Sequence, residues 1–303
     1  MTNPIPVLEA LQKFLAFCSA RNDSRNTLRA YNCDLLLFVE CIGHQTPVTE
    51  INRKRIRQYL FALDANLKDT SLRRKIAAIR SFSHWLYNER HVNIDPSEGI
   101  VGPRLSKKLP DIPSEADMAT LLSGLINCAC PERNQLVLEL LYSCGLRASE
   151  VADVNLGDIN GENTLLVHGK GKKDRLVPVG RCAQRALSAW LPVRSAPLEK
   201  NKLKTDALFF SVGSRKSAER LDVRSIHRIV SGTAKAKGLP AFHPHQLRHA
   251  CATHMHDHGA PLQAVATMLG HARLSTTQIY TRVSTGRMMD VFRRAHPHSK
   301  GRL

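Results

Sequence analysis

The chain has 303 residues, enough for two domains that each bury a core, and its 43% hydrophobic and 23% charged content is ordinary for a globular protein. Its 44 Lys and Arg against 26 Asp and Glu give a formal net charge of +18, which favours a polyanionic partner such as nucleic acid. No apolar run could span a bilayer, the N-terminus lacks the layout of a signal peptide, and the eight scattered cysteines form no Cys-x-x-Cys pair, so we expect a cytoplasmic protein with reduced thiols and no membrane segment.

Residues 1–100 are predicted to form a bundle of four helices. Apolar residues recur at helical spacing from Val7 to Ala20. A second helix is expected to follow an N-cap at Ser24 and to end near Cys41. A third is expected after an N-cap at Thr49, and a fourth from Thr70 or Ser71 onward. The first hundred residues therefore read as one helical domain.

Two of these helices carry dense basic faces. A charge run is often only a solvated face, but two of them in one small bundle of a basic chain favour contacts with phosphates. The predicted DNA-binding residues are Arg53, Lys54, Arg55 and Arg57 on the third helix and Arg73, Arg74, Lys75 and Arg80 on the fourth.

A stretch rich in Pro and Gly, residues 101–113, is predicted to be a basic linker to a larger domain over 114–303. This second domain should begin with helices at about 115–127 and 131–144. Two β-rich runs, 164–168 and 175–179, flank a Gly-Lys turn and predict a hairpin with a lysine at its tip. Helical patterns continue to the end, so the fold class is mainly α, in two domains, with a small β-sheet.

The second domain holds the side chains that strand exchange on DNA requires: a nucleophile, cationic donors for the phosphate oxygens, and groups that move protons. Arg147 opens a helix behind a glycine, and Lys170 lies in the hairpin turn. His245 and Arg248 are three residues apart, which places them on one helical face. His271 follows in Leu-Gly-His, and Tyr280 comes nine residues later.

This order and spacing resemble the active site of the tyrosine recombinase, or phage integrase, family, and the surrounding stretches are similar to bacterial Xer recombinases in particular. The quoted stretches are Gly169-Lys-Gly, Arg175-Leu-Val-Pro-Val179, Cys251-Ala-Thr-His254, Leu269-Gly-His271 and Leu274-Ser-Thr-Thr-Gln-Ile-Tyr280. The likeness covers both domains. It implies a SAM-like helical core-binding domain followed by a mainly helical catalytic domain.

The resemblance also implies a role for each residue. Tyr280 would attack the scissile phosphate and form a 3′-phosphotyrosyl enzyme, while Arg147 and Arg248 would bind the non-bridging oxygens. Lys170 would protonate the 5′ leaving oxygen, His245 would assist proton transfer at the tyrosine, and His271 would bond the phosphate. Lys172 and Lys173 share the turn with Lys170, so the choice of lysine stays open, and both are counted as DNA contacts. Glu150 is expected to orient its helix. No metal, ATP or other cofactor is implied.

The partners that the resemblance implies are double-stranded DNA and a homo- or hetero-tetramer on two paired sites, with a second recombinase or a DNA translocase as further candidates. A short amphipathic helix over 287–294 is expected to dock either on a neighbouring protomer or on its own domain. Resolution of chromosome or plasmid dimers and integration or excision of a mobile element remain alternatives. The DNA target does not follow from one sequence.

Three other functions compete. Histidine pairs at i, i+4, His245 with His249 and His254 with His258, have metal-ligand spacing and suggest a metal-dependent nuclease, although no carboxylate cluster accompanies them. A DNA-binding module without catalysis is disfavoured by the full set of catalytic residue types. A type IB topoisomerase would use the same phosphotyrosine chemistry, and only the tail helix argues for a recombinase instead.

Overall fold

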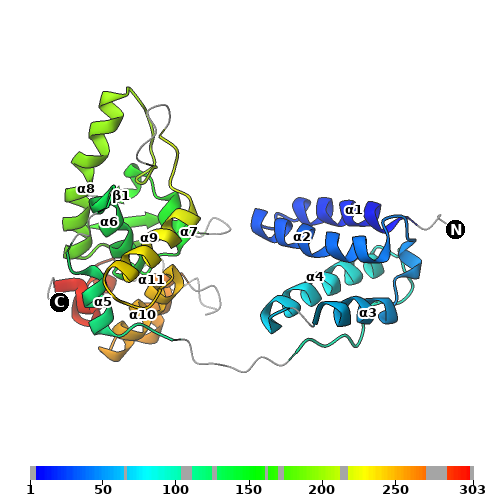
Figure 1. Ribbon diagram of the computed structural model, residues 1–303. Coiled ribbons are helices and arrows are strands. Elements are labelled where there is room, and N and C mark those ends of the chain that lie inside the picture. Colours follow the sequence, from blue (N-terminus) through cyan, green and yellow to red (C-terminus); the bar gives the residue numbers. More distant parts are fainter. Residues whose placement is uncertain are drawn as a thin grey trace. The chain divides into compact units, whose positions relative to one another are not determined.

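The computed structural model describes residues 5–64, 67–103, 111–124, 128–160, 163–169, 174–211, 218–270 and 285–300. The chain divides into two compact units, residues 1–108 and 109–303, and each is described by itself (Figure 1). Most described residues are helical, and the described strands form one small sheet. The expectation of a mainly α fold with a small sheet is confirmed. None of the described helices is both long and apolar enough to cross a bilayer.

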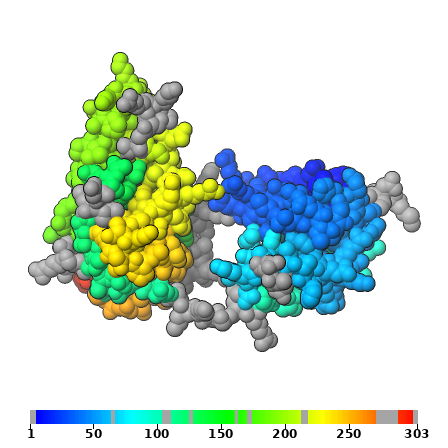
Figure 2. All heavy atoms as spheres, in the orientation of Figure 1, coloured from blue at the N-terminus to red at the C-terminus, as the bar shows by residue number. Residues whose placement is uncertain are grey.

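The first unit is a bundle of four helices around an aromatic core. Its helices are α1 (Val7–Ala20), α2 (Arg25–Ile42), α3 (Arg53–Asp64) and α4 (Asp69–Asn88), with a short 3-10 turn at Val48–Glu50. Phe14 and Phe82 meet edge to face at 5.5 Å between ring centroids, and both are buried. Figure 2 shows the atoms of this unit in blue and cyan. Each helix buries one apolar face, as the periodicity predicted.

Of two N-caps predicted from the sequence, the structure has one and replaces the other. Ser24 caps α2 as predicted, accepting a hydrogen bond from the Thr27 amide at 3.1 Å. Thr49 does not cap α3: it lies in the 3-10 turn, and the Asn52 side chain accepts the Arg55 amide at 3.0 Å instead. Asn is an equally good cap, and its position three residues later shortens the helix at its start.

The described part of the second unit consists of helices and one antiparallel sheet. Its helices are α5 (Glu115–Leu122), α6 (Pro131–Tyr142), α7 (Ala148–Asp153), α8 (Arg181–Lys200), α9 (Val223–Ala236), α10 (Pro244–Asp257), α11 (Leu262–Leu269) and α12 (Thr285–Ala295), with 3-10 turns at Leu156–Asp158 and Pro297–Lys300. Gly124 and Gly145 have positive φ values, +68° and +62°, and each lies within a few residues of a helix end, which explains why α5 and α6 stop before their predicted limits.

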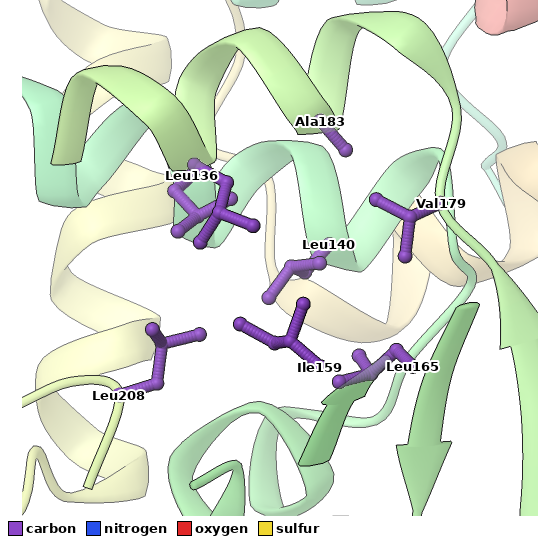
Figure 3. Close-up of a pocket in the computed structure, with 8 residues that line it drawn as sticks. Leu136, Leu140, Ile159, Leu165, Val179, Ala183 and Leu208 are labelled. Atoms are coloured by element: carbon purple, nitrogen blue, oxygen red, sulfur yellow. The ribbon is translucent and has the colours of Figure 1, made fainter. Parts of the chain in front are cut away.

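The sheet has the order β1 (Ile159–Asn160), β2 (Thr164–Val167) and β3 (Arg175–Pro178). The β2 and β3 strands pair antiparallel, with Leu165 opposite Val177. The predicted hairpin is therefore present, and β1 is an additional strand that a two-residue pattern could not reveal. Figure 3 shows Leu140 of α6, Leu165 of β2 and Ala183 of α8 lining one apolar layer, which ties the sheet to the helices behind it.

The C-terminal segment packs on its own unit. Phe292 of α12 is buried and sits against Gly180, where an added Cβ would come within 3.1 Å of the ring. His296 and His298 are also buried, and the His296 ring lies 5.0 Å from that of Tyr142 in α6. Of the two dockings considered from the sequence, the single chain therefore has the one on its own domain.

Candidate active site

A buried carboxylate, Glu150 in α7, binds the neighbouring Arg147 and two arginines from distant parts of the chain, Arg175 and Arg248. Arg147 donates to it twice, through its backbone amide at 2.8 Å and its guanidinium at 2.7 Å. Arg175, the first residue of β3, forms a two-pronged pair with both carboxylate oxygens at 2.9 and 2.8 Å. Arg248 of α10 lies at 3.6 Å from the same carboxylate. One acidic side chain thus sets the position of three cationic ones.

The same three arginines hold three consecutive carbonyls at the end of α11. Arg175 donates to the Met268 carbonyl at 2.8 Å, Arg248 donates to that of Leu269, and Arg147 reaches that of Gly270 at 3.5 Å. The carbonyls at a helix C-terminus lack intrahelical partners and carry the negative end of the helix dipole, so cations suit them. The cluster therefore fixes the chain directly before residue 271. Arg248 is fastened on its other side by a bond to the Gly145 carbonyl at 2.7 Å.

Two glycines make this close approach of backbone and guanidinium possible. Gly145 has a φ of +62°, and an added Cβ would lie 2.5 Å from the Leu269 side chain. Gly270 has a φ of +67°, and its Cβ would meet the Arg175 side chain at 3.1 Å. Both positions need a left-handed backbone and a missing side chain, which only glycine supplies without strain.

The charges of the cluster do not cancel. Burial alone would raise the pKa of Glu150, but hydrogen bonds from Arg175 and Arg147 outweigh it and lower the pKa to about 2. Burial and the neighbouring Arg147 lower the pKa of Arg248 to about 10, which still leaves it charged at neutral pH. Three guanidiniums against one carboxylate leave two net positive charges. Arg147 is 46% exposed, so the site presents this charge to an anion from solvent.

His245 adds a neutral imidazole beside these cations. It lies on the first turn of α10, exposed, one helical turn from the buried Arg248. Partial burial, then the nearby His249 and His243 and the cations Arg248 and Arg147, lower its pKa. The ring is therefore unprotonated at neutral pH and can accept a proton. The predicted pairing of His245 and Arg248 on one helix is confirmed, although their exposure differs.

A histidine lies between two carboxylates where β2 leads into the turn of the hairpin. His168 follows β2, and its two ring nitrogens lie 3.1 Å from Asp174 and 3.2 Å from Asp158. Bonds to Asp174 and then to Asp158 raise the pKa of His168. The predicted Lys170, Lys172 and Lys173 of the turn lie outside the described residues, as do His271 and Tyr280.

The basic faces of the first unit divide into exposed and internally bonded side chains. Lys75 is buried and bonds Asp34 at 3.2 Å, and Arg74 pairs with the same carboxylate. Arg55 pairs with Glu50 at 2.8 Å. Lys75 thus ties α4 to α2 inside the bundle, while Arg55 and the exposed Arg74 form ion pairs at its surface. The other predicted residues, Arg53, Lys54, Arg57, Arg73 and Arg80, are exposed.

The histidine pairs that suggested a metal-dependent nuclease have other partners. His254 is buried, and its Nδ1 lies 3.0 Å from the Tyr142 hydroxyl, while His258 pairs with Glu115 at 3.4 Å. The rings of His245 and His249 meet edge to face at 4.2 Å. Among the described residues, none of these histidines belongs to a group of three metal-ligating side chains.

Sequence reasoning gave Glu150 only the task of orienting its helix and assigned Arg175 no task of its own. The local signal for Glu150 was its position three residues after Arg147, and in the structure the Arg147 amide donates to the Glu150 carboxylate at the start of α7. Arg175 is 25 residues from Glu150, and that pairing has no signature in the spacing. The shared carboxylate became visible only in the folded chain.

Comparison with known proteins gives consistent matches over both units. The model described as Phage integrase family matches residues 114–287, and that of the Phage integrase N-terminal SAM-like domain matches residues 11–90. Tyrosine recombinase XerC of Pelobacter propionicus is 38% identical over 97% of this chain and 97% of its own. Tyrosine recombinase XerD of Oceanobacillus iheyensis is 36% identical over 96% and 99%. The fold is similar to that of a lambda integrase tetramer bound to a Holliday junction, with a TM-score of 0.67 and 16% identity over 92% of this chain and 81% of that one.

Proposed function

Because this chain belongs to the phage integrase family and is a site-specific tyrosine recombinase, we propose that it acts through Arg147, Lys170, His245, Arg248, His271 and Tyr280. The observation that carries the assignment is the group of three guanidiniums on one ionised carboxylate. Its two uncompensated positive charges suit a phosphodiester, whose charge increases in the transition state of attack at phosphorus. The resemblance then assigns the remaining groups.

In the proposed reaction, the Tyr280 hydroxyl oxygen attacks the scissile phosphorus. The bond from phosphorus to the 5′ oxygen breaks, which leaves a 3′-phosphotyrosyl enzyme and a free 5′ hydroxyl. His245 takes the tyrosine proton, a task that its lowered pKa supports, and Lys170 gives a proton to the departing oxygen. Attack by another 5′ hydroxyl reverses these steps and rejoins the strand. The ester keeps the bond energy, so no ATP is consumed.

The two catalytic arginines have different surroundings and therefore different tasks. Arg147 is half exposed and offers its guanidinium to the phosphate from solvent, while Arg248 is buried and rigidly fastened between two carbonyls. A buried donor with fixed geometry needs little reorganisation when negative charge develops. Glu150 and Arg175 position both arginines and do not touch the reacting atoms. His271 directly follows Gly270 in the chain, and Arg147 donates a hydrogen bond to the Gly270 carbonyl.

We propose double-stranded DNA as the partner and a tetramer, of this chain alone or with a second recombinase, as the working assembly. The solved lambda integrase of similar fold is a tetramer on a Holliday junction, which supports this reading. We also propose that residues 1–100 bind the core site, that 101–113 link them to the catalytic domain over 114–303, and that the chain works in the cytoplasm. All eight cysteines are free thiols, in keeping with a reducing compartment.

The test is capture of the covalent intermediate. Wild type and Tyr280→Phe are expressed in matched cells, DNA attached to the protein is recovered under denaturing conditions with EDTA throughout, and the attached fragments are sequenced. We expect an adduct from wild type alone, and its sequences give the recombination site. An adduct that persists in Tyr280→Phe contradicts the choice of nucleophile, and an adduct that EDTA abolishes contradicts metal-independent chemistry.

A further inference from the structure

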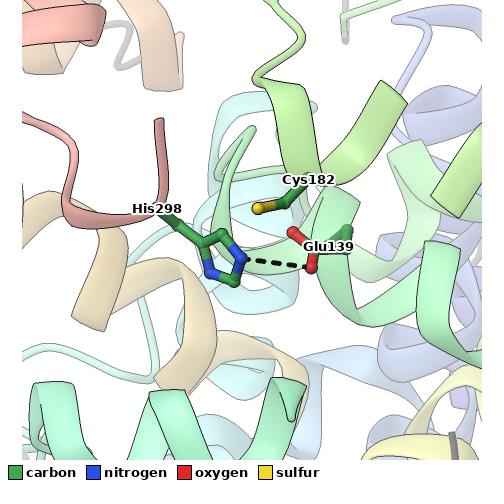
Figure 4. A group of neighbouring side chains, drawn as sticks. All are labelled: Glu139, Cys182 and His298. Atoms are coloured by element: carbon green, nitrogen blue, oxygen red, sulfur yellow. Dashed lines mark ion pairs between the residues drawn. The ribbon is translucent and has the colours of Figure 1, made fainter. Parts of the chain in front are cut away.

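Three side chains of the types that bind transition metals meet where the C-terminal segment packs on the second unit. Glu139 comes from α6, Cys182 from the first turn of α8, and His298 from the 3-10 turn after α12. Figure 4 shows the three side chains pointing toward one another, and their ligand atoms all lie within 4.8 Å of each other. Glu139 and His298 are buried, while Cys182 is partly exposed and gives access from solvent.

The spacing fits a metal ion better than a direct bond. The Glu139 Oε1 and His298 Nε2 atoms are 3.5 Å apart, which is long for a hydrogen bond. Two light ligands of a tetrahedral zinc ion, each bound at about 2.0–2.1 Å, are separated by about 3.4 Å. Cys182 Sγ lies within 4.8 Å of both atoms and would complete the set at a metal–sulfur distance of about 2.3 Å.

The chemistry of the ligands selects the ion. One thiolate, one imidazole and one carboxylate suit zinc and similar divalent ions, and they do not suit magnesium or calcium, which take oxygen ligands. Zn²⁺ with an ionised Glu139, an ionised Cys182 and a neutral His298 has no net charge, so this set can be buried without an unpaired charge. We propose that Glu139, Cys182 and His298 form a binding site for a zinc-like divalent ion, with the fourth position open to solvent.

The neighbouring side chains are arranged to support such a site. Ser143 donates to the Glu139 Oε2 atom at 2.8 Å, which orients the carboxylate and leaves Oε1 toward His298. Gln135 adds a longer bond to Oε1 at 3.4 Å. The exposed Arg185 lies 3.7 Å from the Cys182 sulfur, and metal binding would release it to solvent.

A bound ion would fasten the C-terminal segment. Two ligands lie in the body of the unit and the third lies in the turn after α12, so occupancy stabilises the docked segment over the released one by mass action. The site is separate from the arginine cluster and does not take part in the proposed cleavage. Its ligands are residues 139, 182 and 298, too far apart in the chain for a spacing motif to reveal them.

The test uses Co²⁺ as a spectroscopic substitute for zinc on the full chain, freed of metal with EDTA and then exchanged into chelator-free buffer. A thiolate ligand produces a sulfur-to-cobalt charge-transfer absorption, which histidine pairs elsewhere cannot produce. We expect this absorption to saturate at one equivalent in wild type and in Cys41→Ser, a control at an exposed cysteine of α2. It should vanish in Cys182→Ser, and affinity should fall at least about tenfold in His298→Asn, since even second-shell losses cost that much.

A second readout separates binding at this site from binding elsewhere. Zn²⁺ should slow amide hydrogen exchange in residues 285–300 of wild type and leave it unchanged in Cys182→Ser. Circular dichroism and thermal unfolding in EDTA establish that both variants fold. If wild type shows no thiolate absorption, or if Cys182→Ser keeps it, the proposed site is wrong. Neither result affects the recombinase assignment, which the covalent adduct tests independently.

Discussion

Glu150 organises the proposed active site through its ion pairs with three arginines. Its folded pKa of about 2 lies below the unfolded value near 4.5, so the stabilisation it provides is complete above pH 4.5 and is lost as the pH falls toward 2. The difference corresponds to roughly 3 kcal/mol of unfolding free energy. We expect urea melts of wild type and Glu150→Gln to differ by about this much at pH 7 and to converge in acid. A gap that stays constant between pH 5 and pH 3 would contradict the assignment.

Variants of Arg147 and Arg248, the two arginines that we propose to be catalytic, should separate the loss of activity from the loss of stability. Arg147→Ala removes a half-exposed side chain, so cleavage should fall by about 10²–10³-fold with little change in unfolding temperature. Arg248→Ala leaves the Gly145 and Leu269 carbonyls unbonded and buried, so it should lower both cleavage and unfolding temperature. Single-turnover cleavage assays and thermal melts of both variants measure the two effects. Equal stability loss in both variants would mean that the burial difference has no energetic effect.

What the sequence could reveal at this scale was the list of catalytic residue types, because Arg147, His245 and Arg248 occur in short motifs. Their arrangement around Glu150 could not be foreseen. Arg175 and Arg248 reach that carboxylate from 25 and 98 positions along the chain, and a pairing over such distances depends on how the helices pack. Burial of Lys75 against Asp34 was equally hidden, since a basic run on a helix does not show which member turns inward.

At the scale of elements, the bounds predicted from sequence agree best with the structure for helices that have strong local signals. The apolar period of Val7–Ala20 and the cap at Ser24 predicted α1 and the start of α2 to the residue. The weaker predictions failed where a backbone feature intervened, as at Gly145, whose left-handed conformation ends the α6 segment and turns the chain toward Arg147. This glycine connects the element scale to the site, because its carbonyl is one of the two that hold Arg248.

Gly145→Ala should therefore damage both stability and cleavage. The new Cβ would lie 2.5 Å from the Leu269 side chain on a strained backbone, at a cost of about 1–3 kcal/mol or more. Leu269 would have to move, and with it the carbonyl that fixes Arg248. Gly232→Ala is the matched control: it lies exposed within α9 with nothing within 4 Å of an added Cβ, so it should be neutral or stabilising by up to about 1 kcal/mol. Urea melts and single-turnover cleavage test both, and equal effects would contradict the steric argument.

At the scale of the whole molecule, the basic residues that give the chain its net charge of +18 fall into two groups. Some pair with acidic side chains of the same unit, and others are exposed at the surface. In the first unit, Arg55 pairs with Glu50, and Arg74 and Lys75 share the Asp34 carboxylate. Arg175 pairs with Glu150 at the site in the second unit. Charge that is already paired contributes little to the attraction of a polyanion. The exposed basic residues of α3 and α4 therefore carry the DNA affinity that we propose for the first unit.

The salt dependence of DNA binding measures how much the exposed basic residues of α4 contribute. Each phosphate contact releases counterions from B-DNA, so log K falls with log salt concentration by about 0.9 per contact. Arg73→Ala and Arg80→Ala, both exposed on α4, should together reduce the magnitude of that slope by about 2 and weaken binding to all sequences alike. Lys13→Ala, at an exposed lysine of α1 paired with Glu9, is the control and should leave the slope unchanged. Fluorescence anisotropy of labelled duplexes between about 50 and 200 mM salt gives the slopes. If the control and the double variant shift the slope equally, the attraction arises from net charge alone, and α4 does not lie on the DNA.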